Sequence, residues 1–209
     1  MIFQNRAEAG QKLAEKLGKY AESENTMIIA LPRGGVVVGY EVARALNLPL
    51  DIVVPRKIGA PGNPEFSIGA ITETGEMILN EEVFGISEDY LKNEAEKEKR
   101  EAGRRLKLYR GDRPPLDLKN KTVIIVDDGL ATGLTMRAAI ASVKKMKAKK
   151  IIVAVPITPP EAVELIKKEA DEIIYLEAPL LFGAVGAFYK EFGQTTDEEV
   201  IELLKKSEK

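Results

Sequence analysis

Two adjacent acidic residues, Asp127 and Asp128, directly follow an apolar run at 122–126. The run has the length of a buried strand, and a parallel sheet presents the residues after its strands at the edge where ligands bind. A Thr-Gly-x-Thr turn follows the acids and opens a helix, where free backbone N–H groups, hydroxyls and a glycine suit a phosphate. The pattern indicates an anion site beside an acid pair that can bind a diol or magnesium. The residues of this expected phosphate site are Ala131, Thr132, Gly133, Leu134 and Thr135.

Other phosphate-binding loops fit this stretch less well. A Walker A loop ends in Gly-Lys-Ser/Thr, and the turn at 131–135 has no lysine. The three spaced glycines of a dinucleotide-binding turn are also missing from it. A purely structural alternative remains, in which Asp127 and Asp128 cap the helix and Gly133 only makes a tight turn.

This stretch resembles the signature of the type I phosphoribosyltransferases, which bind phosphoribosyl pyrophosphate (PRPP). The similarity extends over most of the chain, because Pro-Arg-Gly-Gly-Val at 32–36 and Arg-Lys-Ile-Gly-Ala-Pro-Gly-Asn-Pro-Glu at 56–65 resemble members of that family whose substrate is unassigned. The resemblance implies that Asp127 and Asp128 bind the ribose hydroxyls, directly or through Mg²⁺. It also implies that residues 131–135 hold the 5′-phosphate.

A second candidate segment, at 32–35, follows an expected strand at 27–31 and should therefore lie at the same sheet edge as the acids. The resemblance implies that this loop carries backbone amides to the pyrophosphate. Gly34 and Gly35 permit unusual backbone angles, and Arg33 can pair with phosphate oxygens. The alternative is a simple turn from strand to helix with a surface arginine.

Two basic residues, Arg56 and Lys57, follow an expected strand at 52–54. The resemblance implies a basic residue near the pyrophosphate, and Lys57 is the preferred candidate over Arg56, since one of two neighbouring side chains should point away. With Asp127, Asp128 and Arg33, Lys57 completes the expected catalytic set. Residues 58–66 occupy the region of a mobile flap in relatives, although their glycines and prolines suit an ordered loop as well as a moving lid.

The elements that must position these residues follow an α/β pattern. Short β-branched apolar runs alternate with amphipathic stretches, which predicts a mainly parallel sheet flanked by helices. The length of 209 residues is consistent with a single domain spanning 1–209. Residues 57–115 form an expected insertion of flap, hairpin (67–72 with 76–79) and charged helix, and residues 178–209 form a hood and a C-terminal helix.

The charged helix at 88–107 contains 13 charged residues in 20, so a solvated arm with little to bury is expected. Some relatives supply a cation from such a place to a neighbouring subunit's site. In the hood, the resemblance implies that Phe182, Val185 and Phe188 bind a nucleobase. Aromatic residues at this spacing are otherwise ordinary core residues.

Composition excludes several classes of function. The chain has no Cys and no His, which removes thiolate and histidine chemistry and leaves only oxygen ligands for a metal. A net charge of -2 argues against nucleic acid as a partner. No apolar run reaches about 18 residues, so a membrane span is not expected. The expected location is cytoplasmic.

The expected reaction transfers the 5-phosphoribosyl group from PRPP to a small nitrogenous acceptor, a nucleobase, with release of pyrophosphate. In relatives that act on 6-oxopurines, an acid stands where this sequence has Ala131, which argues against hypoxanthine and guanine. The alternative function is a PRPP-sensing regulator without transferase activity. The resemblance also implies a homodimer.

Overall fold

The structure is a computed structural model that describes residues 2–80 and 83–208. Its α-helices are α1 (Arg6–Lys16), α2 (Gly34–Leu46), α3 (Glu88–Arg110), α4 (Leu134–Lys145), α5 (Pro160–Ile166) and α6 (Asp197–Lys206). Two short 3₁₀ helices are η1 (Gly18–Tyr20) and η2 (Val185–Phe188). The strands are β1 (Thr26–Ala30), β2 (Leu50–Ile52), β3 (Arg56–Ala60), β4 (Asn63–Ile71), β5 (Met77–Leu79), β6 (Thr122–Val126), β7 (Lys150–Ile157) and β8 (Glu172–Glu177).

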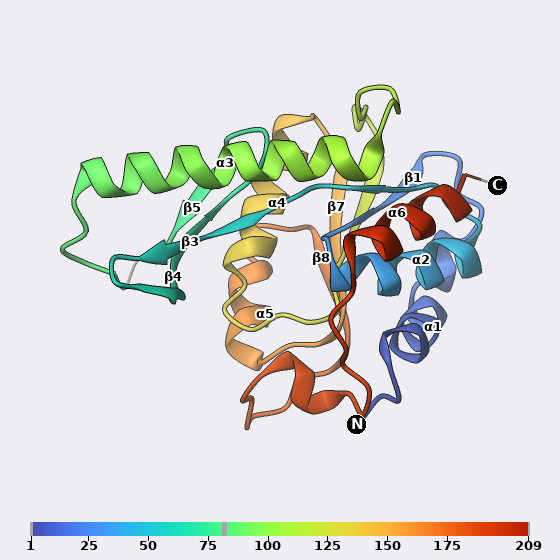
Figure 1. The fold of residues 1–209 in the computed structure, drawn as a ribbon. Coiled ribbons are helices and arrows are strands. Elements are labelled where there is room, and N and C mark those ends of the chain that lie inside the picture. The colour runs from blue at the N-terminus through green and yellow to red at the C-terminus, as the bar shows by residue number, and fades with distance from the viewer. Residues whose placement is uncertain (1, 81–82, 209) are drawn as a thin grey trace.

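The main sheet is parallel and has five strands in the order β2-β1-β6-β7-β8. Helices cover both of its faces, which confirms the predicted fold class (Figure 1). Helices α1, α2 and α6 pack on one face, and α4 and α5 pack on the other. In β1 and β6, Ala30 is paired with Val126. The loops that follow these two central strands therefore leave the sheet side by side.

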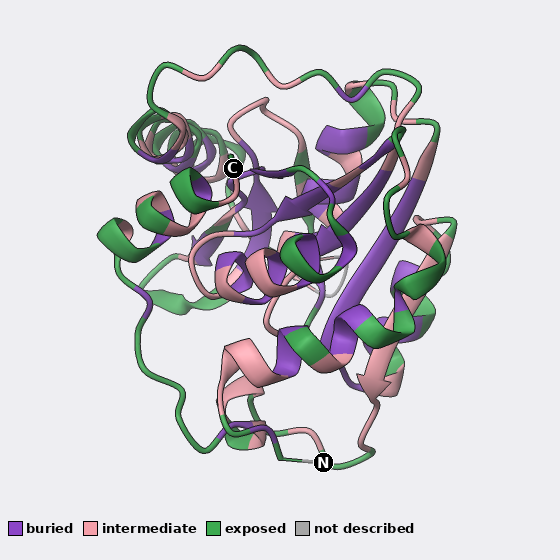
Figure 2. Ribbon diagram, turned by 90° about the vertical axis from the view of Figure 1, so that its right-hand side faces the viewer, coloured by how far each residue is buried: buried purple, intermediate pink, exposed green. Residues whose placement is uncertain are grey.

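The strands of the main sheet are mostly buried, whereas the outer helix faces are exposed (Figure 2). Side chains cap the N-termini of α1 and α6. The Asn5 side chain accepts the Glu8 N–H at 3.0 Å, and the Thr196 hydroxyl accepts the Glu199 N–H at 3.1 Å. In the part of the chain that the structure describes, no helix is both long and apolar enough to cross a bilayer.

One expected boundary was wrong by two residues, because strand β2 covers 50–52 instead of 52–54. Helix α4 begins at Leu134, and the N-cap of α5 is Pro159. The Thr158 side chain is buried and its hydroxyl donates to the Pro159 carbonyl, so it does not cap the helix.

Residues 58–66 lie mostly in two strands, whereas their glycines and prolines suggested an ordered loop or a moving lid. Strands β3 and β4 form an antiparallel hairpin there, and β5 pairs with β4 to complete a second, three-stranded sheet. The turn of this hairpin contains Gly62 at a positive φ of 72°, a conformation that glycine adopts easily. Gly62 thus marks a tight turn between two strands. The predicted pairing of 67–72 with 76–79 is confirmed by β4 and β5.

Helix α3 buries more than its charge suggested, so the expectation of a solvated arm was wrong. Ala95, Ala102 and Tyr109, spaced seven residues apart, lie on its buried face. Ala95 packs on the second sheet, whereas Ala102 and Tyr109 belong to the core of the main domain. The small alanines let α3 lie close to both the second sheet and the main core. A count of charged residues does not detect this buried face of the helix.

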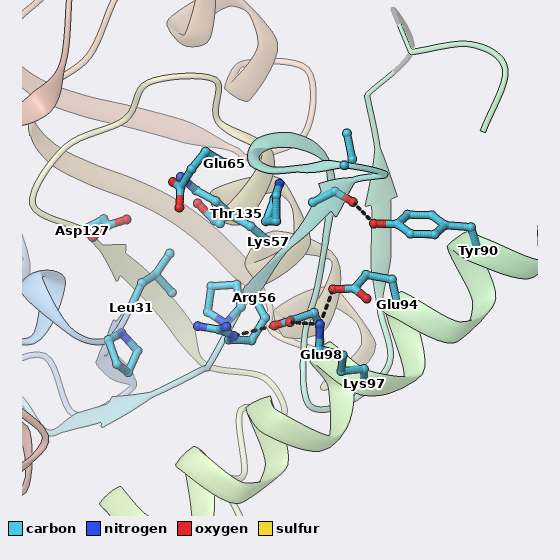
Figure 3. A pocket seen from close by; sticks show the side chains of 16 residues that line it. Leu31, Arg56, Lys57, Glu65, Tyr90, Glu94, Lys97, Glu98, Asp127 and Thr135 are labelled. Atoms are coloured by element: carbon cyan, nitrogen blue, oxygen red, sulfur yellow. Dashed lines mark hydrogen bonds and ion pairs between the residues drawn. The ribbon is translucent and has the colours of Figure 1, made fainter. Parts of the chain in front are cut away.

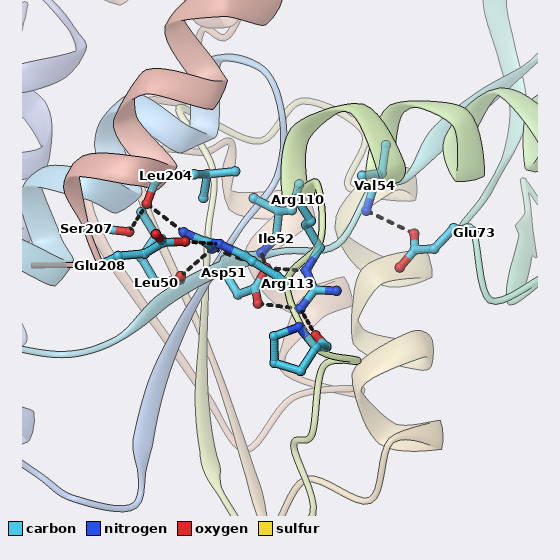
Figure 4. Close-up of polar contacts among 11 residues, drawn as sticks. Leu50, Asp51, Ile52, Val54, Glu73, Arg110, Arg113, Leu204, Ser207 and Glu208 are labelled. Carbon is cyan, nitrogen blue, oxygen red and sulfur yellow. Dashed lines mark hydrogen bonds and ion pairs between the residues drawn. The ribbon is translucent and has the colours of Figure 1, made fainter.

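A buried ion pair attaches the end of α3 to the edge strand β2 (Figure 4). The Arg110 guanidinium donates two hydrogen bonds to the Asp51 carboxylate, at 2.8 and 2.9 Å. Arg113 donates to the Leu204 carbonyl and to the Glu208 carboxylate at the C-terminal end of α6. These contacts fix the base of α3 against the main sheet.

Candidate active site

A cavity of about 570 Å³ lies between the main sheet and the second sheet (Figure 3). One wall is the edge of the main sheet, with Asp127 from the end of β6 and Thr135 from the start of α4. The opposite wall comes from the β3–β4 hairpin and α3. The residues of that wall include Arg56, Lys57, Gly59, Glu65, Tyr90, Glu94, Lys97 and Glu98. The cavity thus joins the predicted acid edge to the 56–65 motif.

The loop at 32–35 lies directly against the acid pair. A Cβ atom at Gly35 would lie 2.7 Å from Oδ1 of Asp127, and one at Gly34 would lie 2.1 Å from Oδ2 of Asp128. Both distances are below any normal contact, so glycine at these positions allows the close approach. The peptide bond between Pro32 and Arg33 is cis. The loop at 32–35 and the acid pair therefore lie in direct contact.

Asp128 is held by groups that sequence reasoning did not identify. Its Oδ2 atom accepts a hydrogen bond from Nε of Arg6 at 2.7 Å, and its backbone carbonyl accepts one from the Tyr189 hydroxyl at 2.6 Å. The backbone N–H of Asp128 in turn donates to Oδ1 of Asp127 at 2.8 Å. No local sequence signal connects Arg6 to this site, because 122 residues separate it from Asp128.

Burial destabilises the charged forms of both acids. Burial raises the pKa of Asp127 well above its ordinary value, and the negative charge of Asp128 raises it further. Burial also raises the pKa of Asp128, while the guanidinium of Arg6 opposes that rise. A cation or hydroxyl donor that arrives beside Asp127 would therefore relieve an unfavourable carboxylate environment.

The predicted phosphate turn has the geometry of a helix start. Gly133 is the N-cap of α4 and has a positive φ of 76°. Ala131 and Thr132 are exposed, and Thr135 is half-buried on the cavity wall. Leu134 is buried, where it packs near Ala138 and Ala70. The side chain of Leu134 thus anchors the turn, in which Gly133 is also buried, while Ala131 and Thr132 stay exposed.

The predicted basic residues are in different environments. Lys57 is exposed and lines the cavity. Arg56 also lines it, but its Nε donates to Oε2 of Glu98 at 2.8 Å. The Arg33 side chain lies elsewhere, with Nη1 at 3.5 Å from Oδ1 of Asp197 at the start of α6. Of these three residues, Lys57 has the charged group that is most accessible from the cavity.

The predicted hood residues pack beside the acid pair and are not part of the cavity lining. The rings of Phe182 and Phe188 stack with their centroids 5.4 Å apart, in a small cluster with Phe3 and Tyr189. A Cβ atom at Gly129 would lie 2.6 Å from Cγ1 of Val185, so η2 presses on the backbone that follows Asp128. The role of these residues in base binding stays a prediction.

Comparison with known proteins identifies the class to which this fold and site belong. Residues 1–187 match the family described as Phosphoribosyl transferase domain. The chain therefore belongs to the phosphoribosyltransferase family, whose fold is the five-stranded parallel sheet flanked by helices described above.

Individual proteins are similar to this chain over most of its length. The crystal structure of TT1426 from Thermus thermophilus matches 99% of this chain and 99% of its own, with a TM-score of 0.82 and 44% identity. A Mycobacterium tuberculosis protein named "Putative phosphoribosyl transferase" is 40% identical over 206 residues, or 97% of this chain. The match covers 46% of that protein, so the chain spans about half the length of the curated relative. The AQ2163 protein from Aquifex aeolicus shares the fold, with a TM-score of 0.50 at 17% identity, over 83% of this chain and 74% of its own.

Proposed function

We propose that this chain transfers the 5-phosphoribosyl group of PRPP to a nitrogenous acceptor and releases pyrophosphate. The observation that carries the proposal is the cavity in which Asp127, Thr135 and Lys57 face one space. An acid, a helix N-terminus and a cation in one cavity suit the diol, the 5′-phosphate and the pyrophosphate of one molecule. Membership of the phosphoribosyltransferase family supports the reaction type.

In the proposed reaction, a bond forms between the acceptor nitrogen and C1 of the ribose. The bond between C1 and the pyrophosphate oxygen breaks, its electron pair leaves with pyrophosphate, and the acceptor nitrogen loses a proton. The ring gains positive charge as the leaving group departs. The ammonium of Lys57 neutralises the leaving pyrophosphate, and the carboxylate of Asp127 holds the ribose hydroxyls while positive charge develops on the ring.

The donor set at the acid edge fits Mg²⁺. Asp127 and Asp128 offer carboxylate oxygens, the ligands that Mg²⁺ prefers. Within residues 2–80 and 83–208, no group of three or more acidic side chains gathers as a metal cage. Mg²⁺ bound here would thus take its remaining ligands from substrate oxygens and water, as is usual for this ion. When bound, it would neutralise charge on the pyrophosphate as a Lewis acid.

Calorimetric titration of the chain with PRPP and Mg²⁺ tests the binding part of the proposal. Wild type should bind PRPP, and Asp127→Asn should weaken binding about tenfold or more, because it removes a charge that faces the ligand. Asp117→Asn is the matched control, since Asp117 is an exposed residue in the loop before β6, at the opposite end of that strand. Equal affinity in all three proteins would contradict the assigned site.

Pyrophosphate release with PRPP and a panel of nucleobases tests the transferase part. Turnover with one acceptor, lost in Asp127→Asn and retained in Asp117→Asn, supports an enzyme. The missing acid at Ala131 argues that this acceptor is not hypoxanthine or guanine. Tight PRPP binding without turnover on any acceptor would instead support a PRPP sensor.

A further inference from the structure

The N-terminal segment and the segment after η2 are joined by backbone hydrogen bonds. The Phe3 N–H donates to the Phe188 carbonyl at 2.8 Å, and the Lys190 N–H donates to the Phe3 carbonyl at 2.9 Å. Figure 1 shows the N-terminus beside this part of the chain. Because of these contacts, α1 begins next to residues 188–193, and its first residue, Arg6, points at the acid pair.

The guanidinium of Arg6 has three partners from two distant segments. Its Nε donates to Oδ2 of Asp128 at 2.7 Å, and its Nη1 donates to the Gly193 carbonyl at 2.7 Å. Its central carbon lies 3.8 Å from the ring centroid of Phe192. The Arg6 side chain is only 12% exposed. A planar group with two hydrogen bonds and a stacked ring has one orientation, so the oxygen of Asp128 that it contacts is fixed as well.

We propose that Arg6 is a positioning residue that orders the Asp128 carboxylate for the ribose of PRPP. The inference rests on the proposed function, because it assigns a supporting residue to that same acid pair. An Asp128 side chain held in one rotamer accepts ribose hydroxyls without first being ordered, which lowers the entropic cost of binding. Neither Arg6 nor Asp128 lines the cavity, whereas Asp127, the neighbour of Asp128, does. Arg6 therefore acts on the acid pair through Asp128 instead of contacting the substrate itself.

An alternative role for Arg6 is to block the Asp128 carboxylate. In that case ribose would have to displace the guanidinium, and removal of Arg6 would tighten ribose binding. The contacts with Gly193 and Phe192 argue against displacement, because they hold Arg6 in place independently of Asp128.

Calorimetry with ribose 5-phosphate, PRPP and inorganic pyrophosphate, each with Mg²⁺, separates these roles. In Arg6→Gln, the Kd for ribose 5-phosphate and for PRPP should rise about tenfold, whereas the Kd for pyrophosphate should change less than about twofold. Arg6→Lys should recover part of the loss, because an ammonium can reach Asp128 but cannot also contact Gly193 with a planar fork. Lys12→Gln removes one cation from an exposed part of the same helix and should leave all three Kd values unchanged.

A double-mutant cycle with Asp128→Asn tests whether Arg6 acts through Asp128. The Kd for ribose 5-phosphate in the double variant should equal that of Asp128→Asn alone. Additive losses, a parallel rise for pyrophosphate, or tighter ribose binding in Arg6→Gln would each overturn the proposal.

Circular dichroism confirms folding, and if Arg6→Gln does not fold, the same comparison is made with Arg6→Lys. Wild type that binds neither PRPP nor ribose 5-phosphate would reject the proposed function itself, whereas wild type that binds both, with equal affinity in the Arg6 variants, would reject only this inference.

Discussion

Gly35 lies so close to Asp127 that a Cβ atom at position 35 would come within 2.7 Å of Oδ1 and 2.9 Å of Cα of that residue. The second contact is with backbone, so it cannot be relieved by rotation of a side chain. The loop at 32–35 and the end of β6 must therefore move apart to accept any other residue.

Gly35→Ala should consequently weaken PRPP binding about tenfold and lower the free energy of unfolding by about 1–3 kcal/mol, as overpacking usually does. Calorimetry and urea unfolding measure the two effects. Gly103→Ala is the matched control, because a Cβ atom there would meet nothing within 4 Å. That control should leave binding unchanged and stabilise α3 by about 0.5–1 kcal/mol. A Gly35→Ala variant with wild-type affinity would show that the loop is not part of the site.

Glu98→Gln should strengthen the binding of inorganic pyrophosphate by a few-fold. Glu98 accepts the hydrogen bond from Arg56 and is itself only 8% exposed, so the loss of its charge leaves the positive charge of Arg56 uncompensated on the cavity wall. The gain should shrink as salt screens the charges, and titrations at low and high salt measure it. Glu101→Gln makes the same change of charge elsewhere on α3, where the partners are Arg104 and Arg105. Equal gains from both variants would mean that net charge alone is responsible.

Arg110→Ala should lower the free energy of unfolding by about 2–4 kcal/mol, because it leaves the buried carboxylate of Asp51 without its bidentate partner. Arg113, with Nη1 at 3.9 Å, compensates only in part. Urea unfolding measures the loss. Lys167→Ala, which breaks an exposed pair with Glu164, should change the same quantity by less than about 0.5 kcal/mol. Similar values for the two variants would contradict the importance of the Asp51 contact.

Glu73→Gln should stabilise the protein more at pH 7 than at pH 4. Burial raises the pKa of Glu73, although its carboxylate accepts the Val54 N–H at 3.0 Å. The unfolded chain releases this proton near an ordinary pKa of about 4.3, so wild-type stability falls as pH rises from there toward the higher folded pKa. Glutamine does not titrate and retains an acceptor for Val54. Urea unfolding across this range gives the difference, with Glu164→Gln as the control for one lost surface charge. A difference that is constant with pH would show that Glu73 does not carry this penalty.

The alternation of apolar runs and amphipathic stretches was sufficient to predict the main sheet. Its central strands are buried on both faces and leave a continuous apolar signal. The position of Asp127 at the sheet edge followed directly, because strand ends in a parallel sheet share one edge. The second sheet was predicted only in part, since Pro61 and Gly62 form its first turn within a stretch that reads as an irregular loop.

The contacts of Arg6 could not be predicted at all. Its neighbours in sequence indicate only the start of α1, whereas its partners come from the end of β6 and from residue 193. The same holds for Arg33, whose guanidinium meets Asp197 at the start of α6. Long-range pairs of this kind depend on how helices pack, and a single sequence carries no periodic signal for them.

The lining of the cavity comes from two separate sheets. The strands of one sheet do not pair with those of the other, so substitutions in the β3–β4 hairpin or on α3 can reshape one wall without changing the hydrogen-bond register that fixes Asp127. A lineage that carries this architecture can therefore diversify in the residues of the second sheet and α3 while the edge that carries Asp127 stays constant.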